Sequence, residues 1–234
     1  KQMQAQLLQS EKLSTIGRLG SGVAHELNSP LTGLLSLLRS YRKETKEGTR
    51  EYEDFADMIQ AAEHMARVIS DLNAFSRVSK GESADISLQD VVESTLSFSA
   101  YPLIQKKIKI TKDYAADLLK IHADKSRLQQ VVLNLVTNAY DAMAEGGELT
   151  IRLRNSDEGD KVIAEFIDTG TGIKEEDMQK LFDPFFTTKE PGKGTGLGLS
   201  ISHGIIQSYQ GKISVESTYG KGAKFIIALP SAGK

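Results

Sequence analysis

The sequence predicts an α+β protein that consists of a helical hairpin followed by an α/β sandwich. In the first 80 residues the only proline is Pro30, and apolar residues recur at helical spacing. After that point helix-like and strand-like patterns alternate, and 14 of the 20 glycines fall at or after Gly146. We therefore expect a helical domain at 1–80, a linker at 81–87 and a second domain at 88–234.

The composition is that of an ordinary globular protein, with 39% hydrophobic and 26% charged residues. A formal net charge of −2 argues against nucleic acid or an anionic membrane as the main partner. No segment approaches the ~20 apolar residues that a membrane-spanning helix needs, and the absence of cysteine fits a reducing compartment. We expect this segment to be cytoplasmic and without membrane contact. The glutamine-rich helical pattern at Lys1–Ser10 leads us to expect further chain upstream, which could carry a membrane anchor.

Two amphipathic helices are predicted in the N-terminal part. The first carries apolar, small or helix-breaking residues at alternating steps of three and four, here called the heptad stripe: Leu13, Ile16, Gly20, Val23, Leu27, Pro30, Leu34, Leu37 and Tyr41. After a turn signal at Lys46–Arg50, the same steps resume at Tyr52, Phe55, Ile59, Ala62, Ala66 and Ile69. The two helices should therefore form an antiparallel hairpin.

Further apolar residues widen the apolar face of each helix beyond what one neighbour can cover. They are Leu19, Leu31, Leu35, Leu38, Met58, Met65 and Leu72. Because apolar surface of this extent requires a partner, two hairpins should pair as a homodimeric four-helix bundle.

The second part is predicted to form one mixed sheet covered by helices. Helices are expected at 91–101 and 126–143, with Asp124 as a candidate N-cap for the latter. Alternation and β-branched residues predict strands at 148–155, 161–168, 211–218 and 223–230. Between the second and third of these strands, the segment GTGLGLSISHGIIQSY is predicted to be a glycine-rich loop that opens a helix.

The segment VAHELNSPLTGLL places charged and polar residues inside the first helical pattern. The heptad positions put His25 on the side opposite the apolar stripe, where it faces solvent or another domain. Glu26 follows directly, and Ser29 lies one turn further along on the same face. A carboxylate beside an exposed imidazole raises its basicity and holds the tautomer whose other ring nitrogen can attack an electrophile. His25 is thus a candidate nucleophile, whereas an isolated helical histidine is more commonly a surface residue.

Three elements of the second part are candidates for nucleotide binding. Asn134 and Asn138 lie one turn apart on one helix face, and their amide oxygens suit either a magnesium ion or a helix interface. Asp168 ends a strand and begins DTGTGI, where its carboxylate could accept the adenine amino group and the glycines allow close approach. The segment GKGTGLGLS opens a helix whose unpaired amides favour phosphate.

The segment between the two glycine-rich elements is a candidate lid. It carries aromatic anchors at Phe182, Phe185 and Phe186, followed by Lys189, which could reach a phosphate. A long surface loop would show the same composition, so both interpretations stay open.

Together these motifs resemble the catalytic core of a bacterial sensor histidine kinase over essentially the whole chain. The segments VAHELNSPL, LNLVTNAYDA, DTGTGI, FDPFFTTK and GTGLGLS are similar to the histidine, asparagine, first glycine, phenylalanine and second glycine boxes, in that order. The segment FFTTK with its short lid is most similar to the nitrogen-regulator type. The resemblance implies a dimerisation and phosphotransfer hairpin followed by a Bergerat-type ATP-binding domain.

The resemblance also implies roles for individual residues. His25 would accept the γ-phosphoryl group of ATP, with Glu26 as its general base, and an aspartate on a response-regulator receiver domain would accept it next. Asn138 would ligate Mg²⁺ with Asn134 in support, and Asp168 would bind adenine. The nucleotide pocket would also include Gly170, Gly172, Ile173, Thr188, Lys189, Gly194, Thr195, Gly196, Leu197 and Gly198.

Three further points follow from the comparison of this chain with the family pattern. At the phosphatase position, four residues after the histidine, the family usually has threonine or asparagine and this chain has Ser29, whose shorter hydroxyl could still position a water. A dimeric scaffold that binds nucleotide without turnover would not require the complete set of motifs. An ATP-driven clamp, as in the gyrase relatives, would not require a phosphoacceptor histidine.

Overall fold

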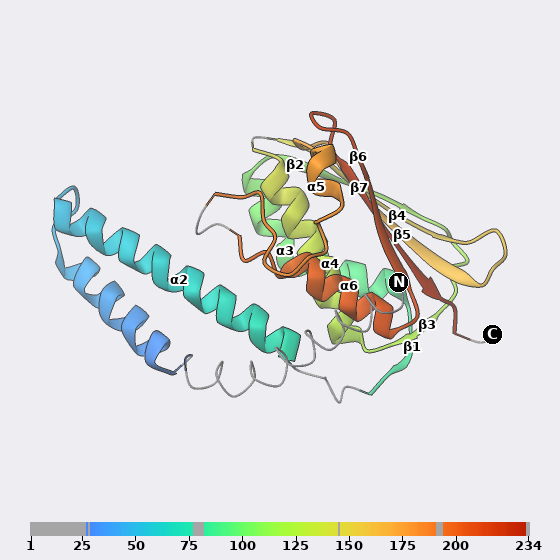
Figure 1. The fold of residues 1–234 in the computed structure, drawn as a ribbon, viewed down its shortest axis with the longest axis horizontal. Helices are drawn as coiled ribbons and strands as arrows, with labels where there is room; N and C mark the ends of the chain where they lie inside the picture. The colour runs from blue at the N-terminus through green and yellow to red at the C-terminus, as the bar shows by residue number, and fades with distance from the viewer. Residues whose placement is uncertain (1–26, 28, 77–81, 145, 191–193, 233–234) are drawn as a thin grey trace. The chain divides into compact units, whose positions relative to one another are not determined.

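The structure, a computed structural model, describes residues 27, 29–76, 82–144, 146–190 and 194–232. The described residues fall into two compact units. One unit holds the helical hairpin together with Phe185–Leu197, and the other holds a β-sheet with its covering helices (Figure 1). Among the described residues, no helix combines the length and the apolar character that a membrane crossing needs.

The predicted hairpin is confirmed in the part of it that the structure describes. A first helix covers residues 29–44, and α2 covers Arg50–Ser76. The turn between them uses Gly48 at a φ of 81°, and the Thr49 hydroxyl accepts a hydrogen bond from the Tyr52 amide at 3.3 Å, so that it caps α2. An ion pair between Arg39 and Glu63, at 2.8 Å, joins the two helices further along.

The residues that pack the two helices of one hairpin together differ from those predicted for the first helix. The hairpin core consists of Leu31, Leu35, Leu38, Ala62, Ala66 and Ile69. On α2 the prediction is confirmed, because Ala62 and Ile69 are buried. On the first helix most of the heptad stripe lies off the contact face, since Leu34 and Leu37 are 44% and 57% exposed whereas Leu31 is buried. Tyr41, at the end of the stripe, does contact α2, where its ring stacks on that of Phe55 at 5.9 Å between centroids. A single helix with two apolar stripes offers two candidate contact faces, and spacing alone cannot decide which one meets α2.

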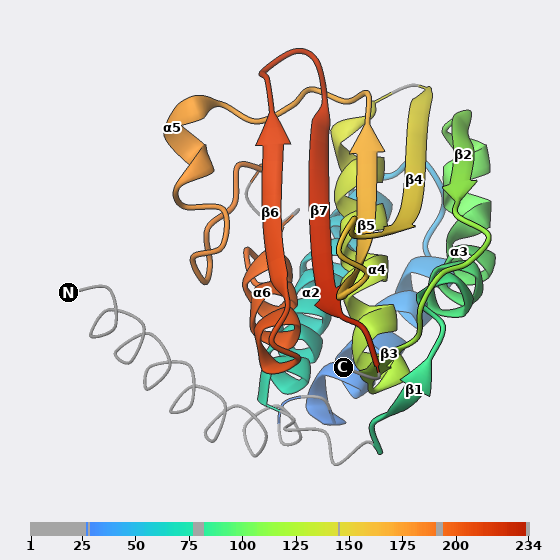
Figure 2. The ribbon, with the colours of Figure 1, turned by 90° about the vertical axis from the view of Figure 1, so that its right-hand side faces the viewer.

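The second unit is built on a five-stranded mixed sheet with the strand order β2-β4-β5-β7-β6. Figure 2 shows these strands side by side. The strands are β2 (Ile108–Tyr114), β4 (Gly147–Asn155), β5 (Lys161–Asp168), β6 (Lys212–Ser217) and β7 (Ala223–Pro230). Only the β2–β4 pair is parallel. The four strands predicted from alternation correspond to β4, β5, β6 and β7, which confirms a mixed sheet.

The structure also contains three strands without a predicted counterpart. β1 (Ala84–Ile86) and β3 (Ile121–Ala123) form a separate two-stranded antiparallel ribbon. Three residues are too few to show alternation. β2 begins with Ile-Lys-Ile, but the alternation of apolar and polar residues ends there, because Thr111, Lys112 and Asp113 follow in sequence.

Three helices cover one face of the sheet, as Figures 1 and 2 show. They are α3 (Leu88–Gln105), α4 (Lys125–Ala142) and α6 (Gly198–Ser208), and a single turn, α5 (Glu175–Met178), lies at the start of the candidate lid. α4 buries six apolar residues, namely Leu128, Val131, Val132, Leu135, Val136 and Ala139. The predicted cap is confirmed, because the Asp124 carboxylate accepts hydrogen bonds from the amides of Ser126 at 2.8 Å and Arg127 at 3.4 Å.

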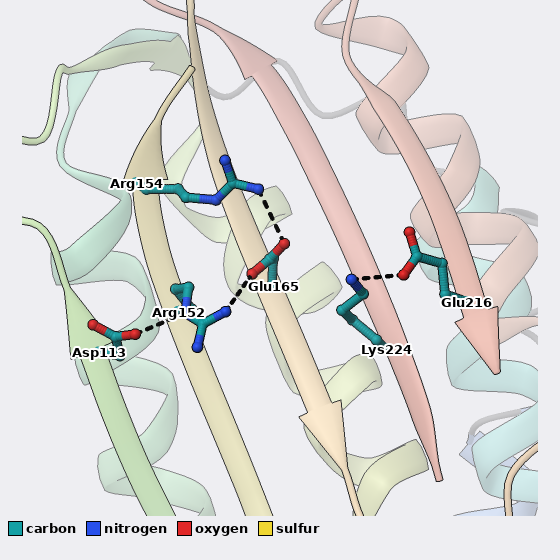
Figure 3. A network of polar contacts seen from close by, with 6 residues as sticks. All are labelled: Asp113, Arg152, Arg154, Glu165, Glu216 and Lys224. Atoms are coloured by element: carbon teal, nitrogen blue, oxygen red, sulfur yellow. Dashed lines mark hydrogen bonds and ion pairs between the residues drawn. The ribbon is translucent and has the colours of Figure 1, made fainter. Parts of the chain in front are cut away.

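The other face of the sheet carries ion pairs that run across neighbouring strands (Figure 3). Arg152 on β4 pairs with Asp113 on β2 at 2.7 Å and with Glu165 on β5 at 3.3 Å. Arg154 reaches the second oxygen of Glu165 at 3.2 Å, so this buried carboxylate is held from two sides. A buried charge is tolerated where it is paired in this way. The face opposite the helices is thus polar, and the apolar core lies between sheet and helices.

We expect Asp124→Ala to lower the free energy of unfolding of the sheet-containing unit by about 1 kcal/mol, because two α4 amides lose their acceptor. Urea unfolding of the full chain, followed by circular dichroism, measures this change. Asp124→Ser keeps a capping oxygen and is the matched control. Equal losses in the two variants would show that the side-chain cap does not stabilise α4.

Candidate nucleotide site

α4 and α6 together position the first polar group of the candidate site. The amide nitrogen Nδ2 of Asn134 donates a hydrogen bond to the buried Ser202 hydroxyl at 2.9 Å. The carbonyl oxygen Oδ1 of Asn134 lies over Gly198, where any Cβ would collide with it. Gly198 is thus needed for the close approach of α6 to this amide. The two contacts orient Asn134, with its nitrogen toward Ser202 and its oxygen toward the beginning of α6.

Asn138 lies one turn beyond Asn134 on the same helix, and both are half-buried beside fully buried neighbours. Amide oxygens on one helix face suit a hard cation that retains most of its waters. The orientation of the Asn134 amide leaves its oxygen as the atom available for such a role, so these residues fit a magnesium ion.

Asp168 is the second polar group and lies at the end of β5. Its Oδ1 atom accepts hydrogen bonds from the amide of Gly170 at 2.8 Å and from that of Ala223, at the start of β7, at 3.3 Å. Burial raises the pKa of Asp168 above its ordinary value, although the two amides act in the opposite direction. An ionised aspartate accepts hydrogen bonds only, so this group can bind an exposed amino group.

The loop that follows Asp168 is fastened to the end of α4 on one side. The amide of Thr171 donates to the carbonyl of Ala142 at 3.1 Å. Gly172 has a φ of 66°, and a Cβ there would collide with the Thr218 carbonyl, so glycine is required by backbone conformation and by space. Asp168, Gly170, Gly172 and Ile173 therefore form one fixed loop, residues 168–173.

The candidate lid has an ordered base. The amide of Phe185, inside the lid segment, donates to the carbonyl of Gly196 at 2.9 Å and so ties the lid to the glycine-rich element that follows it. Within it, Lys189 donates its amide to the Thr187 hydroxyl at 3.2 Å, and Leu197 donates its amide to the Thr195 hydroxyl at 3.3 Å. These contacts define a loop closed at its base.

The structure places the predicted site residues in three groups. In the sheet-containing unit it brings Asn134 together with Gly198, and it joins α4 to the loop that holds Asp168, Gly170, Gly172 and Ile173. The lid residues Thr188, Lys189, Gly194, Thr195, Gly196 and Leu197 belong to the other compact unit, so their part in the site rests on the sequence. His25 and Glu26 lie outside the described residues, and Ser29 is exposed on the first helix.

The structure also identifies site residues that sequence patterns did not indicate. Ser202 orients Asn134, and Ala223 donates to Asp168 through its backbone. A serine one helical turn after Gly198 carries no distinctive signal, and a backbone donor carries none at all. The segment YGKGAK contains Ala223, and its two glycines predict a tight turn between two of the strands. No other feature of the sequence indicates that this turn lies beside the site.

The sheet-containing unit thus places an amide pair on α4 and a strand-end carboxylate in a glycine-containing loop that is fastened to the end of the same helix. Residues 123–233 match the family described as histidine kinase-, DNA gyrase B-, and HSP90-like ATPase. Residues 15–81 match the His Kinase A (phospho-acceptor) domain.

Individual proteins agree with these family matches. The sensor kinase CckA of Brucella abortus is 37% identical over 98% of this chain, which spans 26% of that relative's length. The catalytic domain of histidine kinase ThkA is 33% identical, with a TM-score of 0.58 over 64% of this chain and 98% of that one. A structure of ThkA in complex with response regulator protein TrrA is 26% identical, with a TM-score of 0.69 over 95% of this chain and 64% of that one. This chain belongs to the histidine kinases.

We expect Asp168→Asn to raise the thermal midpoint of the nucleotide-free chain at neutral pH. The raised pKa means that the folded state binds a proton more tightly than the unfolded state does, so the ionised carboxylate costs stability above that pKa. The neutral amide removes this cost, and the advantage should shrink as the pH falls through the pKa of Asp168. Thermal denaturation at neutral and mildly acidic pH measures both effects, and a lower midpoint at neutral pH would contradict the explanation.

Proposed function

We propose that this chain is the kinase core of a sensor protein, which uses ATP to phosphorylate His25 and then passes the phosphoryl group to an aspartate of a response regulator. The observation that carries the proposal is the fixed position of Asp168, held by the amides of Gly170 and Ala223, in a chain that also matches a phospho-acceptor domain. Among the described residues, its Oδ1 atom receives both backbone hydrogen bonds, and its other oxygen, Oδ2, remains for the adenine amino group.

The transfer requires one bond exchange. A ring nitrogen of His25 attacks the γ-phosphorus, a nitrogen–phosphorus bond forms, and the bond to the bridging oxygen breaks so that ADP leaves. Glu26 takes the proton that the imidazole loses. Bound magnesium supplies neutralisation of the phosphate charge, with Asn138 and Asn134 as the residues that would hold it. The main contribution of the protein to catalysis is therefore to position the imidazole and the γ-phosphate for reaction.

Each chain presents an apolar surface that supports a homodimer. On the first helix Leu27, Leu34, Leu37 and Tyr41 are exposed, as are Met58 and Met65 on α2. Soluble proteins rarely leave contiguous apolar patches of this kind uncovered. We assign this surface to the second hairpin of a four-helix bundle, since the hairpin core is formed by a different stripe.

Further features of the proposal rest on the sequence. The proposed domains are 1–80 and 88–234 with a linker at 81–87, in which β1 lies and pairs with β3 of the second domain. The FFTTK segment supports the nitrogen-regulator subtype. The complex of ThkA with TrrA supports a receiver domain as the partner. An exposed Ser29 is available to position water for dephosphorylation of the regulator. Lack of cysteine supports a cytoplasmic location.

We expect His25→Ala to abolish labelling by γ-labelled ATP in the presence of magnesium, while ATP binding persists, because the acceptor nitrogen is lost. Label on the wild-type chain should be acid-labile and alkali-stable. His122→Ala, which changes an exposed histidine paired with Asp85 at 2.8 Å, is the control and should keep full labelling. Label that survives in His25→Ala would move the acceptor elsewhere, and a wild-type chain that binds ATP without label would indicate a nucleotide-binding scaffold.

We expect Gly198→Ala to weaken magnesium-dependent ATP binding about tenfold, equivalent to ~1.4 kcal/mol, because the new methyl group displaces the Asn134 amide. Gly204→Ala on the same helix is the matched control, since a Cβ there meets nothing within 4 Å. That variant should keep its affinity and stabilise α6 by up to about 1 kcal/mol. Isothermal titration calorimetry measures the affinities, and equal binding by the two variants would exclude the proposed role of Asn134.

A further inference from the structure

The β6–β7 turn, residues 218–222, lies directly against the loop that carries Asp168. The amide of Gly220 donates to the carbonyl of Thr171 at 2.7 Å. Gly222 has a φ of 89°, and a Cβ there would collide with the Asp168 carbonyl. The backbone of the turn therefore passes too close to Asp168 to admit any side chain at this point.

Ser217, the last residue of β6, connects the two segments through its side chain. Its Oγ atom accepts a hydrogen bond from the amide of Ile173 at 2.9 Å and donates one to the carbonyl of Gly222 at 2.7 Å. One hydroxyl thus ties the end of the 168–173 loop to the end of the β6–β7 turn. Ser217 is half-buried, so loss of the hydroxyl would leave a donor and an acceptor with poor access to water.

The contact that this arrangement holds in place is the longer of the two bonds to the carboxylate. The Ala223 amide directly follows Gly222 and reaches Asp168 Oδ1 at 3.3 Å, whereas the Gly170 amide is at 2.8 Å. A bond already near the limit of hydrogen-bond length is broken by a small displacement of the turn. Without it, the carboxylate would be held by one amide and could rotate.

We propose that Ser217 is a positioning residue for Asp168, and that it sets the preference of the site for purine nucleotides with an exocyclic 6-amino group. This inference rests on the proposed binding of adenine by Asp168. Ser217 acts on the orientation of the carboxylate, through Gly222 and Ala223, without contact with the base. It therefore controls discrimination between bases more strongly than it controls phosphate binding.

The test compares ADP with purine riboside 5′-diphosphate, which lacks the 6-amino group, by calorimetric titration of the full chain. We expect the wild-type chain to bind ADP about 10-fold to 100-fold more tightly, as a hydrogen bond to a charged group provides. Ser217→Ala should reduce that ratio by about fivefold to tenfold through weaker ADP binding, with little change for the analogue. Asp168→Asn should remove most of the ratio.

Two controls separate positioning from general damage. Ser214→Ala removes a hydroxyl from the same strand but on the opposite face of the sheet, and should keep the wild-type ratio. The double variant Asp168→Asn/Ser217→Ala should show the ratio of Asp168→Asn alone, because Ser217 has no separate route to the base. Should Ser217→Ala fail to fold, Ser217→Cys gives a slightly larger side chain with a weaker donor and should change the ratio in the same direction.

Equal loss of affinity for both diphosphates in Ser217→Ala, or no loss at all, would overturn the positioning role while leaving the function of Asp168 intact. A wild-type chain that binds the two diphosphates equally would instead overturn the proposed binding of adenine by Asp168. The failure of the inference and the failure of the proposed function are thus distinguished by the wild-type ratio.

Discussion

The candidate site depends on one buried carboxylate that is held by backbone amides. Asp168 ends β5, and its two hydrogen bonds reach forward to Gly170 and across to Ala223 at the start of β7. Burial disfavours the charge that these bonds stabilise. Such a group keeps a defined orientation only while both amides stay in place. Much of the local structure, including the close approach of Gly222, follows from this requirement.

α4 provides the second constraint, because it serves the core and the site at once. Its buried residues, among them Leu135 and Val136, pack in the core, while Asn134 contacts α6 and Asn138 lies one turn further along α4. The same helix ends at Ala142, whose carbonyl accepts the amide of Thr171. One rigid element thus sets the distance between the amides proposed to bind a cation and the loop proposed to bind adenine, so site geometry follows from core packing.

The order of helices and the strands β4 to β7 could be predicted because their apolar residues follow regular periods and Asp124 is a strong capping residue. The candidate residues at the strand end and on α4 were selected because their segments resemble known motifs, since an amide pair on a helix face alone suits either a magnesium ion or a helix interface; their roles stay predictions. Ser202 and Ser217 could not be predicted, since their importance arises from contacts between segments far apart in the chain. The hairpin core on the first helix was mispredicted for the same reason. Periodicity identifies the apolar faces of a helix, but it does not show which face contacts which neighbouring helix.

The two edges of the open sheet determine how readily the protein aggregates in concentrated solution. A five-stranded open sheet has two edges, here β2 and β6, whose free backbone groups could pair with strands of other chains. Both edges carry exposed charged side chains, with Lys109 and Lys112 on β2 and Lys212 and Glu216 on β6. Pairing of a second chain with either edge would strip water from these charged side chains, which is unfavourable. These side chains protect the sheet against aggregation, and apolar self-association is left to the hairpin.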